Sequence, residues 1–481
     1  MKHPITLITY ADSLGGNLAE LNRALDRHFS GAIGGVHLLP FFPSSGDRGF
    51  APLCYDRVDP AFGDWDDVAR LTEGRSAVYD FMINHLSRQS PEFLDFLEKH
   101  DASPYRDLFL RYRDFWPDGV PSEQEVEHLY RRKPTMPCVD VTFADGTSEK
   151  IWCTFGDQQM DLNAASPVTK EFIRRSLTGL MDRGASVIRL DAFAFAVKKL
   201  GTSCFFVEPE MWELLEECRA VAQPRGVELL LEMHDHYTIQ QKLAEHGHLV
   251  YDFALPMLLL HTLYTGDGSA LRHWFDICPK HCHTTLDTHD GMGVPDVEGL
   301  LEPEQVRHVI QTLLTRGANI KWAFREGSLD HTNLLNAYQM NATYYSALGE
   351  NDDAYLLARA IQFFAPGTPQ VYYVGLLAGK NDAERFAATG LLTDVNRHSY
   401  TPEEIDREAQ RPVVRRLLAL MRLRNSCEAF DGSFEVLPTP ADRLQIRRAL
   451  GETQAVLDAD LKRFSFTVRV TDREGERLLT F

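Results

Sequence analysis

Eight short runs of β-branched and other apolar residues recur along the chain, and helix-like segments separate several of them. The runs cover residues 5–10, 35–42, 77–84, 186–193, 228–234, 249–255, 284–288 and 369–375. Between them, segments such as 17–29 and 209–222 carry apolar residues at the i, i+3, i+4 spacing of an amphipathic helix. Strands that alternate with helices indicate βαβ units and a parallel sheet. Eight such units predict an α/β fold of the (β/α)₈ TIM-barrel type.

Two gaps between the runs are too long for simple crossovers, and the end of the chain has a different pattern. Residues 85–165 and 291–350 fit insertions at the catalytic face of the barrel, where the loops after the strands grow. From about residue 431, short alternating strands predict a small all-β C-terminal domain. We therefore expect a barrel formed by 1–84, 166–290 and 351–430, inserted domains at 85–165 and 291–350, and a C-terminal domain at 431–481.

The composition limits the partners of the chain. Hydrophobic residues make up 44% and charged residues 25% of the 481 residues, which is typical of a globular protein. The net charge of −19 argues against nucleic acid or an anionic membrane as the main partner. We find no signal peptide, and the apolar stretch 253–264 is too short to span a membrane. Eight sparse cysteines suit a reducing cytosol, so we expect a cytoplasmic protein; a homodimer is compatible with the sequence, which does not decide the oligomeric state.

One short stretch contains a cluster of potential metal ligands. The stretch CPKHCH contains Cys278, His281, Cys282 and His283. Its spacing differs from that of structural zinc sites, and no second Cys/His pair follows nearby. We interpret it as a loop that leads into a strand and expect no metal.

Charged residues close several of the predicted strands. Asp191 ends the fourth run, Glu232 ends the fifth, and Asp290 follows the seventh. His85 ends the third run and His289 precedes Asp290. A single aspartate at a strand end is more often a helix cap or an ion-pair partner. The carboxyl ends of barrel strands all face one mouth, however, and this coincidence favours an active site there.

Paired carboxylates at one mouth point to glycosidic bond chemistry. In a retaining mechanism one carboxylate attacks the anomeric carbon, while the other protonates the leaving oxygen and later acts as a base. Arg189 lies two residues before Asp191, on the same side of the strand, where it can keep the nucleophile ionised. Glu232 needs a raised pKa to act as the acid, which an apolar environment supplies.

These residues resemble the signature blocks of glycoside hydrolase family 13, the α-amylase clan. The blocks are Asn84–His85, Arg189–Asp191, Glu232 and His289–Asp290, in the order of that clan. Within it the chain is most similar to the sucrose phosphorylase subfamily. Stretches that carry this likeness include FGDWDDV at 62–68, TTLDTHDGMGV at 284–294 and PGTPQVYYVGLLAGKND at 366–382. The likeness covers essentially the whole chain.

The resemblance implies a role for each matched position. It implies that Asp191 is the nucleophile, Glu232 the general acid/base and Asp290 the stabiliser of the transition state. Contacts to glucose would come from Asp47, His85, Phe155, Arg189, His234, His289 and Arg397. The acceptor and phosphate side would be formed by Lys133, Phe195, Asn336, Ala337, Tyr338 and Gln339. Arg131 and Arg132 fit either this side or a solvated surface. The resemblance implies no cofactor and no metal, and it implies a small sugar and inorganic phosphate as substrates.

The departures from the subfamily lie on the acceptor side. Asn336 and Ala337 stand where Asp-Leu or Asp-Ile is expected, and Phe195 and Ser399 stand where tyrosine is usual. Loss of a hydroxyl at Phe195 alters how a site discriminates between acceptors. The predicted reaction is sucrose plus phosphate to α-glucose 1-phosphate plus fructose, through a covalent β-glucosyl intermediate. Alternatives are a phosphorylase that uses glycerol, glycerate or fructose 6-phosphate, a retaining α-glucosidase, and a non-catalytic sugar-binding barrel.

Overall fold

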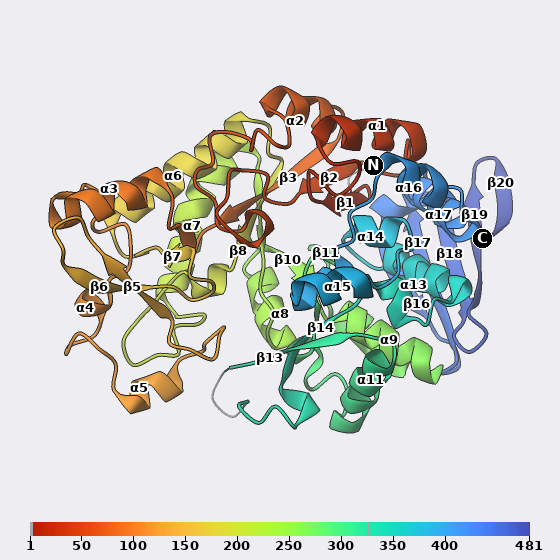
Figure 1. Cartoon of the computed structure of the whole chain (residues 1–481). Coiled ribbons are helices and arrows are strands. Elements are labelled where there is room, and N and C mark those ends of the chain that lie inside the picture. Colours follow the sequence, from red (N-terminus) through yellow and green to blue (C-terminus); the bar gives the residue numbers. More distant parts are fainter. Residues whose placement is uncertain (1–2, 325–327) are drawn as a thin grey trace.

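Eight parallel strands close into a barrel at the centre of the protein (Figure 1). The computed structural model describes residues 3–324 and 328–481, except for the side chain of Asp47. Around the barrel the strands follow the order β1, β2, β3, β8, β9, β10, β11 and β15, and β15 pairs again with β1. Their bounds are β1 Thr6–Thr9, β2 Gly35–Leu38, β3 Ser76–Met82, β8 Val187–Asp191, β9 Glu228–Leu231, β10 Leu249–Asp252, β11 Cys282–Thr284 and β15 Thr368–Tyr372. The predicted (β/α)₈ barrel is confirmed.

Each of the eight predicted strands overlaps one strand of the barrel, and the largest difference is at the seventh. That strand was predicted at 284–288, but β11 begins at Cys282, which pairs with Val250 of β10. Cys282 and His283 are therefore strand residues inside the CPKHCH stretch, and both are buried. The polar residues of this stretch hid the start of the strand, because strand prediction relies on apolar runs.

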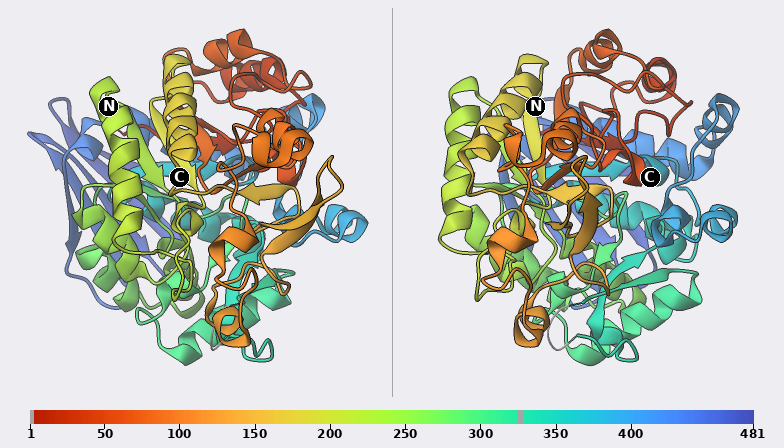
Figure 2. Two further views of the ribbon diagram at one scale, coloured as in Figure 1. Left: turned by 90° about the vertical axis from the view of Figure 1, so that its left-hand side faces the viewer. Right: turned by 60° about the vertical axis from the view of Figure 1, so that its left-hand side comes forward.

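Helices surround the barrel and form its outer layer (Figures 1 and 2). The predicted helices at 17–29 and 209–222 are confirmed as α1 and α7. The Asn17 side chain caps α1 by accepting from the Glu20 amide at 3.0 Å, and the apolar face of the helix, with Leu18, Leu21 and Leu25, is buried. The helix bounds are α1 Leu18–His28, α2 Trp65–Thr72, α3 Pro91–Lys99, α4 Tyr112–Phe115, α5 Glu123–His128, α6 Pro167–Asp182, α7 Glu210–Ala222, α8 Tyr237–Glu245, α9 Leu255–Thr265, α10 Ser269–Ile277, α11 Pro303–Thr315, α12 Tyr344–Ala347, α13 Asp352–Phe364, α14 Tyr373–Leu376, α15 Ala383–Thr389, α16 Pro402–Glu408 and α17 Pro412–Ser426.

Small sheets lie outside the barrel. In the 85–165 region β4 (His85–Ser87) pairs with β7 (Gln159–Asp161), and β5 (Cys138–Thr142) pairs with β6 (Ser148–Trp152). In the 291–350 region β12 (Met292–Gly293), β14 (Ala337–Asn341) and β13 (Asn319–Trp322) form a sheet in that order. Both regions flank the barrel rather than crossing it.

A five-stranded antiparallel sheet ends the chain. Its strands are β16 (Ser433–Leu437), β17 (Arg443–Leu450), β18 (Thr453–Asp460), β19 (Ser465–Asp472) and β20 (Gly475–Thr480). Figure 1 shows this sheet on the side of the barrel opposite to β5 and β6, so it lies away from that insertion. Among residues 3–324 and 328–481, none of the helices is long and apolar enough to span a membrane.

Candidate active site

Three carboxylates meet at the mouth of the barrel, as the sequence predicted. Asp191 is the last residue of β8, Glu232 directly follows β9, and Asp290 lies in the loop after β11. All three line one cavity. They come together because the carboxyl ends of parallel barrel strands face the same side.

Arg189 bridges two buried carboxylates beneath this cavity. Its Nη1 donates to Asp191 Oδ1 at 2.8 Å and also to Asp80, which lies on the neighbouring strand β3. Its Nη2 lies 3.8 Å from Glu232 Oε1. The predicted contact between Arg189 and Asp191 is therefore present, and Asp80 joins it from inside the barrel.

The backbone directly after Asp191 holds Glu232 in place. Ala192 has φ 54° and ψ 27°, in the left-handed region that a residue with a Cβ rarely adopts. In this conformation its N–H donates to Glu232 Oε2 at 3.0 Å. Such a conformation costs of the order of 1–3 kcal/mol and persists only when the surroundings enforce it. One turn of backbone therefore places the proposed acid beside the proposed nucleophile.

The pKa values of Asp191 and Asp290 are shifted in opposite directions. Burial raises the pKa of Asp191 well above its ordinary value; the Arg189 guanidinium opposes this rise, and the negative charge of Glu232 adds to it. Burial also disfavours ionised Asp290, but His289, Lys321 and Arg397 outweigh it and lower the pKa of that carboxyl. We expected Arg189 to keep Asp191 ionised. The contact exists, yet the pKa of Asp191 shifts upward, because burial and the neighbouring carboxylates together outweigh the Arg189 guanidinium.

Aromatic rings and polar groups form the wall beside Asp290. Phe50 stacks on His289 with ring centroids 4.9 Å apart, and His85 Nε2 lies 2.8 Å from the Phe50 carbonyl oxygen. Arg397 Nε donates to the His289 carbonyl at 2.8 Å, and Arg397 Nη2 lies 3.8 Å from Asp290 Oδ1. Phe155 packs against His85 at 5.6 Å. An apolar platform beside hydrogen-bonding groups suits a sugar ring.

The opposite wall combines aromatic rings with positive charge. Phe195, Tyr338 and Gln339 line the cavity there, together with Arg132 and Lys321. The Arg132 guanidinium lies 3.8 Å from the centre of the Tyr338 ring. The Nε of this half-buried arginine has no hydrogen-bond partner in the part of the chain that the structure describes. Arg132 and Lys321 give this wall the positive charge that the binding of an anion requires.

The structure does not bring every predicted acceptor residue to the cavity. Lys133 Nζ lies 3.3 Å from Asp157 Oδ1 and 3.1 Å from Cys153 Sγ, and Lys133 is not among the lining residues. The Asn336 amide donates to the Asp330 carbonyl at 2.8 Å, and Ala337 is buried at the start of β14; neither lines the cavity. Asp47 begins a short 3₁₀ helix, and its side chain lies outside the described part of the structure.

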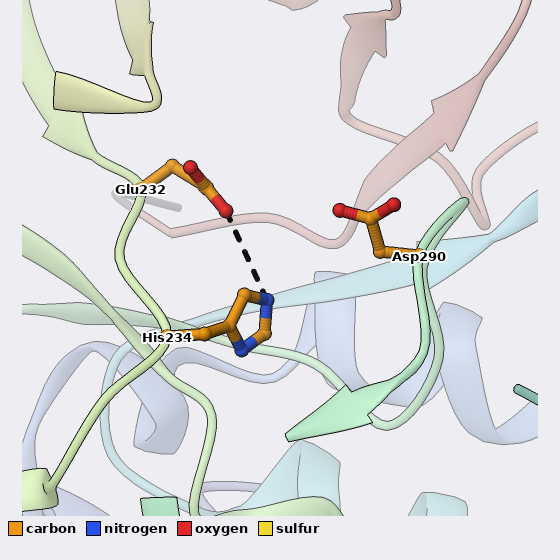
Figure 3. A group of neighbouring side chains, drawn as sticks. All are labelled: Glu232, His234 and Asp290. Atoms are coloured by element: carbon orange, nitrogen blue, oxygen red, sulfur yellow. Dashed lines mark ion pairs between the residues drawn. The ribbon is translucent and has the colours of Figure 1, made fainter. Parts of the chain in front are cut away.

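Glu232, His234 and Asp290 form a cluster whose ligand atoms lie within 4.8 Å of one another (Figure 3). In this figure the carboxyl groups of Glu232 and Asp290 point toward each other, and the His234 ring lies below them. His234 Nε2 is 3.9 Å from Glu232 Oε1, and its ring stacks on Phe253 at 3.8 Å. The guanidinium groups near Glu232 and Asp290 already supply positive charge, so the donor set fits sugar hydroxyls better than a divalent cation.

Sequence reasoning missed several residues that shape the site. Asp80 interrupts the apolar run of β3, and this buried charge was a signal that could have identified it. The sequence did not decide whether Arg132 lies on the acceptor side or on the solvated surface. It gave no indication of a role for Phe50 or Lys321. Their place in the cavity follows from loop packing, for which the sequence carried no periodic signal.

The chain matches a family model over part of its length and several known proteins over most of it. A family model described as alpha amylase, catalytic domain, matches residues 30–252. The chain is 50% identical to a sucrose phosphorylase of Streptococcus mutans over 97% of both chains, and 42% identical to a glucosylglycerol phosphorylase of Marinobacter adhaerens over 98% of both. The crystal structure of sucrose 6F-phosphate phosphorylase from Thermoanaerobacter thermosaccharolyticum superimposes with a TM-score of 0.97 at 42% identity, covering 100% of this chain and 99% of that one.

Proposed function

Since the chain belongs to the sucrose phosphorylase subfamily of glycoside hydrolase family 13 and is a glycoside phosphorylase of that group, we propose that it converts sucrose and phosphate to α-glucose 1-phosphate and fructose. The observation that carries the proposal is the pairing of Asp191 with Glu232 at one mouth, beside a cationic acceptor wall. The pair can perform double displacement, and the wall can deliver phosphate to the second step.

The first step releases fructose. Asp191 attacks the anomeric carbon of glucose while Glu232 protonates the departing fructose oxygen, so the glycosidic bond breaks and a β-glucosyl ester forms. Positive charge develops on the sugar ring in the transition state. Asp290, whose carboxylate is kept ionised by His289, Lys321 and Arg397, faces this charge and stabilises it.

The second step uses phosphate in place of water. A phosphate oxygen attacks the anomeric carbon, its proton passes to the Glu232 carboxylate, and Asp191 leaves as a carboxylate. Two inversions give α-glucose 1-phosphate with overall retention. Arg132 and Lys321 supply positive charge to hold the phosphate; the centre of the Tyr338 ring lies 3.8 Å from the Arg132 guanidinium and 6.0 Å from Lys321 Nζ.

The same cations support a second candidate substrate. A phosphate group carried by fructose would meet the charges that we assign to inorganic phosphate, so sucrose 6F-phosphate is the alternative that Arg132 and Lys321 favour. It is also the substrate named for the relative of known structure.

The purified protein should be incubated with sucrose, with and without inorganic phosphate, and assayed for glucose 1-phosphate and free glucose. Glucose 1-phosphate that forms only with phosphate supports the proposal. Free glucose at the same rate in both reactions would instead identify a retaining α-glucosidase. If sucrose does not react, the reverse reaction from glucose 1-phosphate with fructose, fructose 6-phosphate, glycerol and glycerate identifies the acceptor.

A further inference from the structure

A chain of buried polar groups runs beneath Asp191 inside the barrel. It crosses three neighbouring strands, from His37 on β2 to Asp80 on β3 and Arg189 on β8. His37 Nε2 lies 2.7 Å from Asp80 Oδ2, the other Asp80 oxygen accepts from Arg189, and Arg189 Nη1 lies 2.8 Å from Asp191. The His37 and Asp80 side chains are completely buried. His37 is thus linked to the nucleophile without touching the cavity.

The direction of each hydrogen bond follows from chemistry. Ionised Asp80 can only accept, so His37 donates its Nε2–H and Arg189 donates Nη1–H. Arg189 Nη1 serves both Asp80 and Asp191, and the two carboxylates therefore compete for one nitrogen. Each donor that Asp80 receives from elsewhere weakens its pull on Arg189.

We propose that His37 is a positioning residue for glucosyl transfer: by donating to Asp80, it lets Arg189 hold Asp191 in the orientation and charge state that the covalent step needs. This inference rests on the proposed double displacement at Asp191. It assigns a role to His37, which is connected to the substrate only through Asp80, Arg189 and Asp191.

The surroundings of His37 leave few other groups that could play this part. The titratable and charged groups that face this chain of polar groups are Asp80 from β3, Arg189 from β8, Glu232 after β9, Tyr251 from β10 and His283 from β11, with His289 and Asp290 facing it from the mouth. His283 is engaged elsewhere, since its Nδ1 lies 2.8 Å from Gln370 Nε2. Within residues 3–324 and 328–481, no group partners His37 Nδ1, so the histidine interacts through its Nε2.

The chain of polar groups from His37 to Arg189 acts when the charge of Asp191 changes. Ester formation neutralises the Asp191 carboxylate, and loss of the sugar in the second step restores its negative charge. An arginine oriented toward Asp191 favours the ionised nucleophile before the first step and the carboxylate leaving group in the second. A weaker hold on Asp191 raises the pH at which the nucleophile becomes ionised, whereas a purely structural defect leaves that pH unchanged.

Two variants of His37 differ only in the reach of their amide group. Gln places its side-chain N–H near the position of the His37 Nε2–H, and Asn, shorter by one carbon, does not reach Asp80. His283→Asn is the matched control, because His283 is another buried histidine of a barrel strand but bonds to Gln370 rather than to this chain.

The assay is the pH dependence of kcat/KM for α-glucosyl fluoride, measured with the whole chain. Fluoride leaves without protonation by Glu232, so the acid limb of the profile reports ionisation of Asp191. We expect His37→Asn to move this limb upward by about half to one pH unit and to lower kcat/KM below it by about three- to tenfold. His37→Gln should largely restore the wild-type profile, and His283→Asn should keep the acid limb of the wild type.

An acid limb unchanged in folded His37→Asn, or shifted equally in His283→Asn, would overturn the proposal. If His37→Asn fails to fold, an acid limb in His37→Gln that departs from the wild type further than that of His283→Asn overturns it, and one that matches the wild type supports it. Turnover of the fluoride by the wild-type protein tests the proposed function separately, because it does not depend on the identity of the natural acceptor.

Discussion

Exchange of Arg132 for glutamine tests which basic residue of the 130–134 segment binds phosphate. Arg132 lines the cavity, whereas the neighbouring Lys133 contacts Asp157 and Cys153 instead. Loss of a hydrogen bond to a charged group costs about 1.5–3 kcal/mol. At about 1.4 kcal/mol per factor of ten, we expect the KM for phosphate to rise by about 10- to 150-fold in Arg132→Gln. The KM for the glucosyl donor should change far less, because Arg132 lies on the acceptor wall.

The measurement is initial-rate kinetics of glucose 1-phosphate formation, with phosphate and the glucosyl donor varied separately. Lys133→Gln is the matched control. Its partially exposed ion pair with Asp157 lies outside the cavity, so we expect its KM for phosphate to stay within about threefold of the wild type. The reasoning fails if Lys133→Gln loses phosphate affinity and Arg132→Gln retains it, since Lys133 rather than Arg132 would then bind the phosphate.

Four further outcomes are expected. Asp191→Asn should lower kcat by at least about a thousandfold in the phosphorolysis assay, because it removes the proposed nucleophile; undiminished turnover would exclude the covalent role. Phe195→Tyr returns a hydroxyl to the acceptor wall and should change the ratio of kcat/KM between fructose and glycerol in the reverse reaction by about tenfold or more, whereas an unchanged ratio would separate this position from acceptor choice. Arg359→Met leaves the buried Asp287 carboxylate without its 2.7 Å partner, so urea unfolding should show a loss of about 3–5 kcal/mol, and a loss below about 1 kcal/mol would contradict the buried pair. Burial opposes ionisation of Asp80, but Arg189 and His37 outweigh this effect and lower the pKa of Asp80 to about 2. The ionised carboxylate therefore contributes stability that is complete above about pH 4 and is lost as the pH falls through 2. Asp80→Asn should lose less stability than the wild type over that pH interval, and equal losses in the two proteins would refute the assignment.

The barrel and its three carboxylates were accessible from the sequence. Parallel strands that are buried on both faces appear as apolar runs, and their carboxyl ends must face one mouth once eight of them close. Asp191, Glu232 and Asp290 therefore converge wherever the exact strand bounds lie. A strand that contains polar residues is harder to recognise in the sequence, as at Cys282 and His283 in β11.

The acceptor wall and the interior of the barrel depended on the tertiary structure. Arg132 and Lys133 are adjacent in an irregular segment, and no periodicity tells which of them faces the cavity. Their directions follow from packing, with Tyr130 against Phe195 and Lys133 beside Asp157.

The link from His37 through Asp80 to Asp191 required the registers of three strands that lie far apart in the chain. By itself the sequence determined the fold class and which carboxylates meet, because strand periodicity and strand order are local and topological properties. Only the tertiary structure decided which cations line the cavity and which histidine bonds to Asp80, because side-chain direction in loops and register between distant strands are set by packing of the whole molecule.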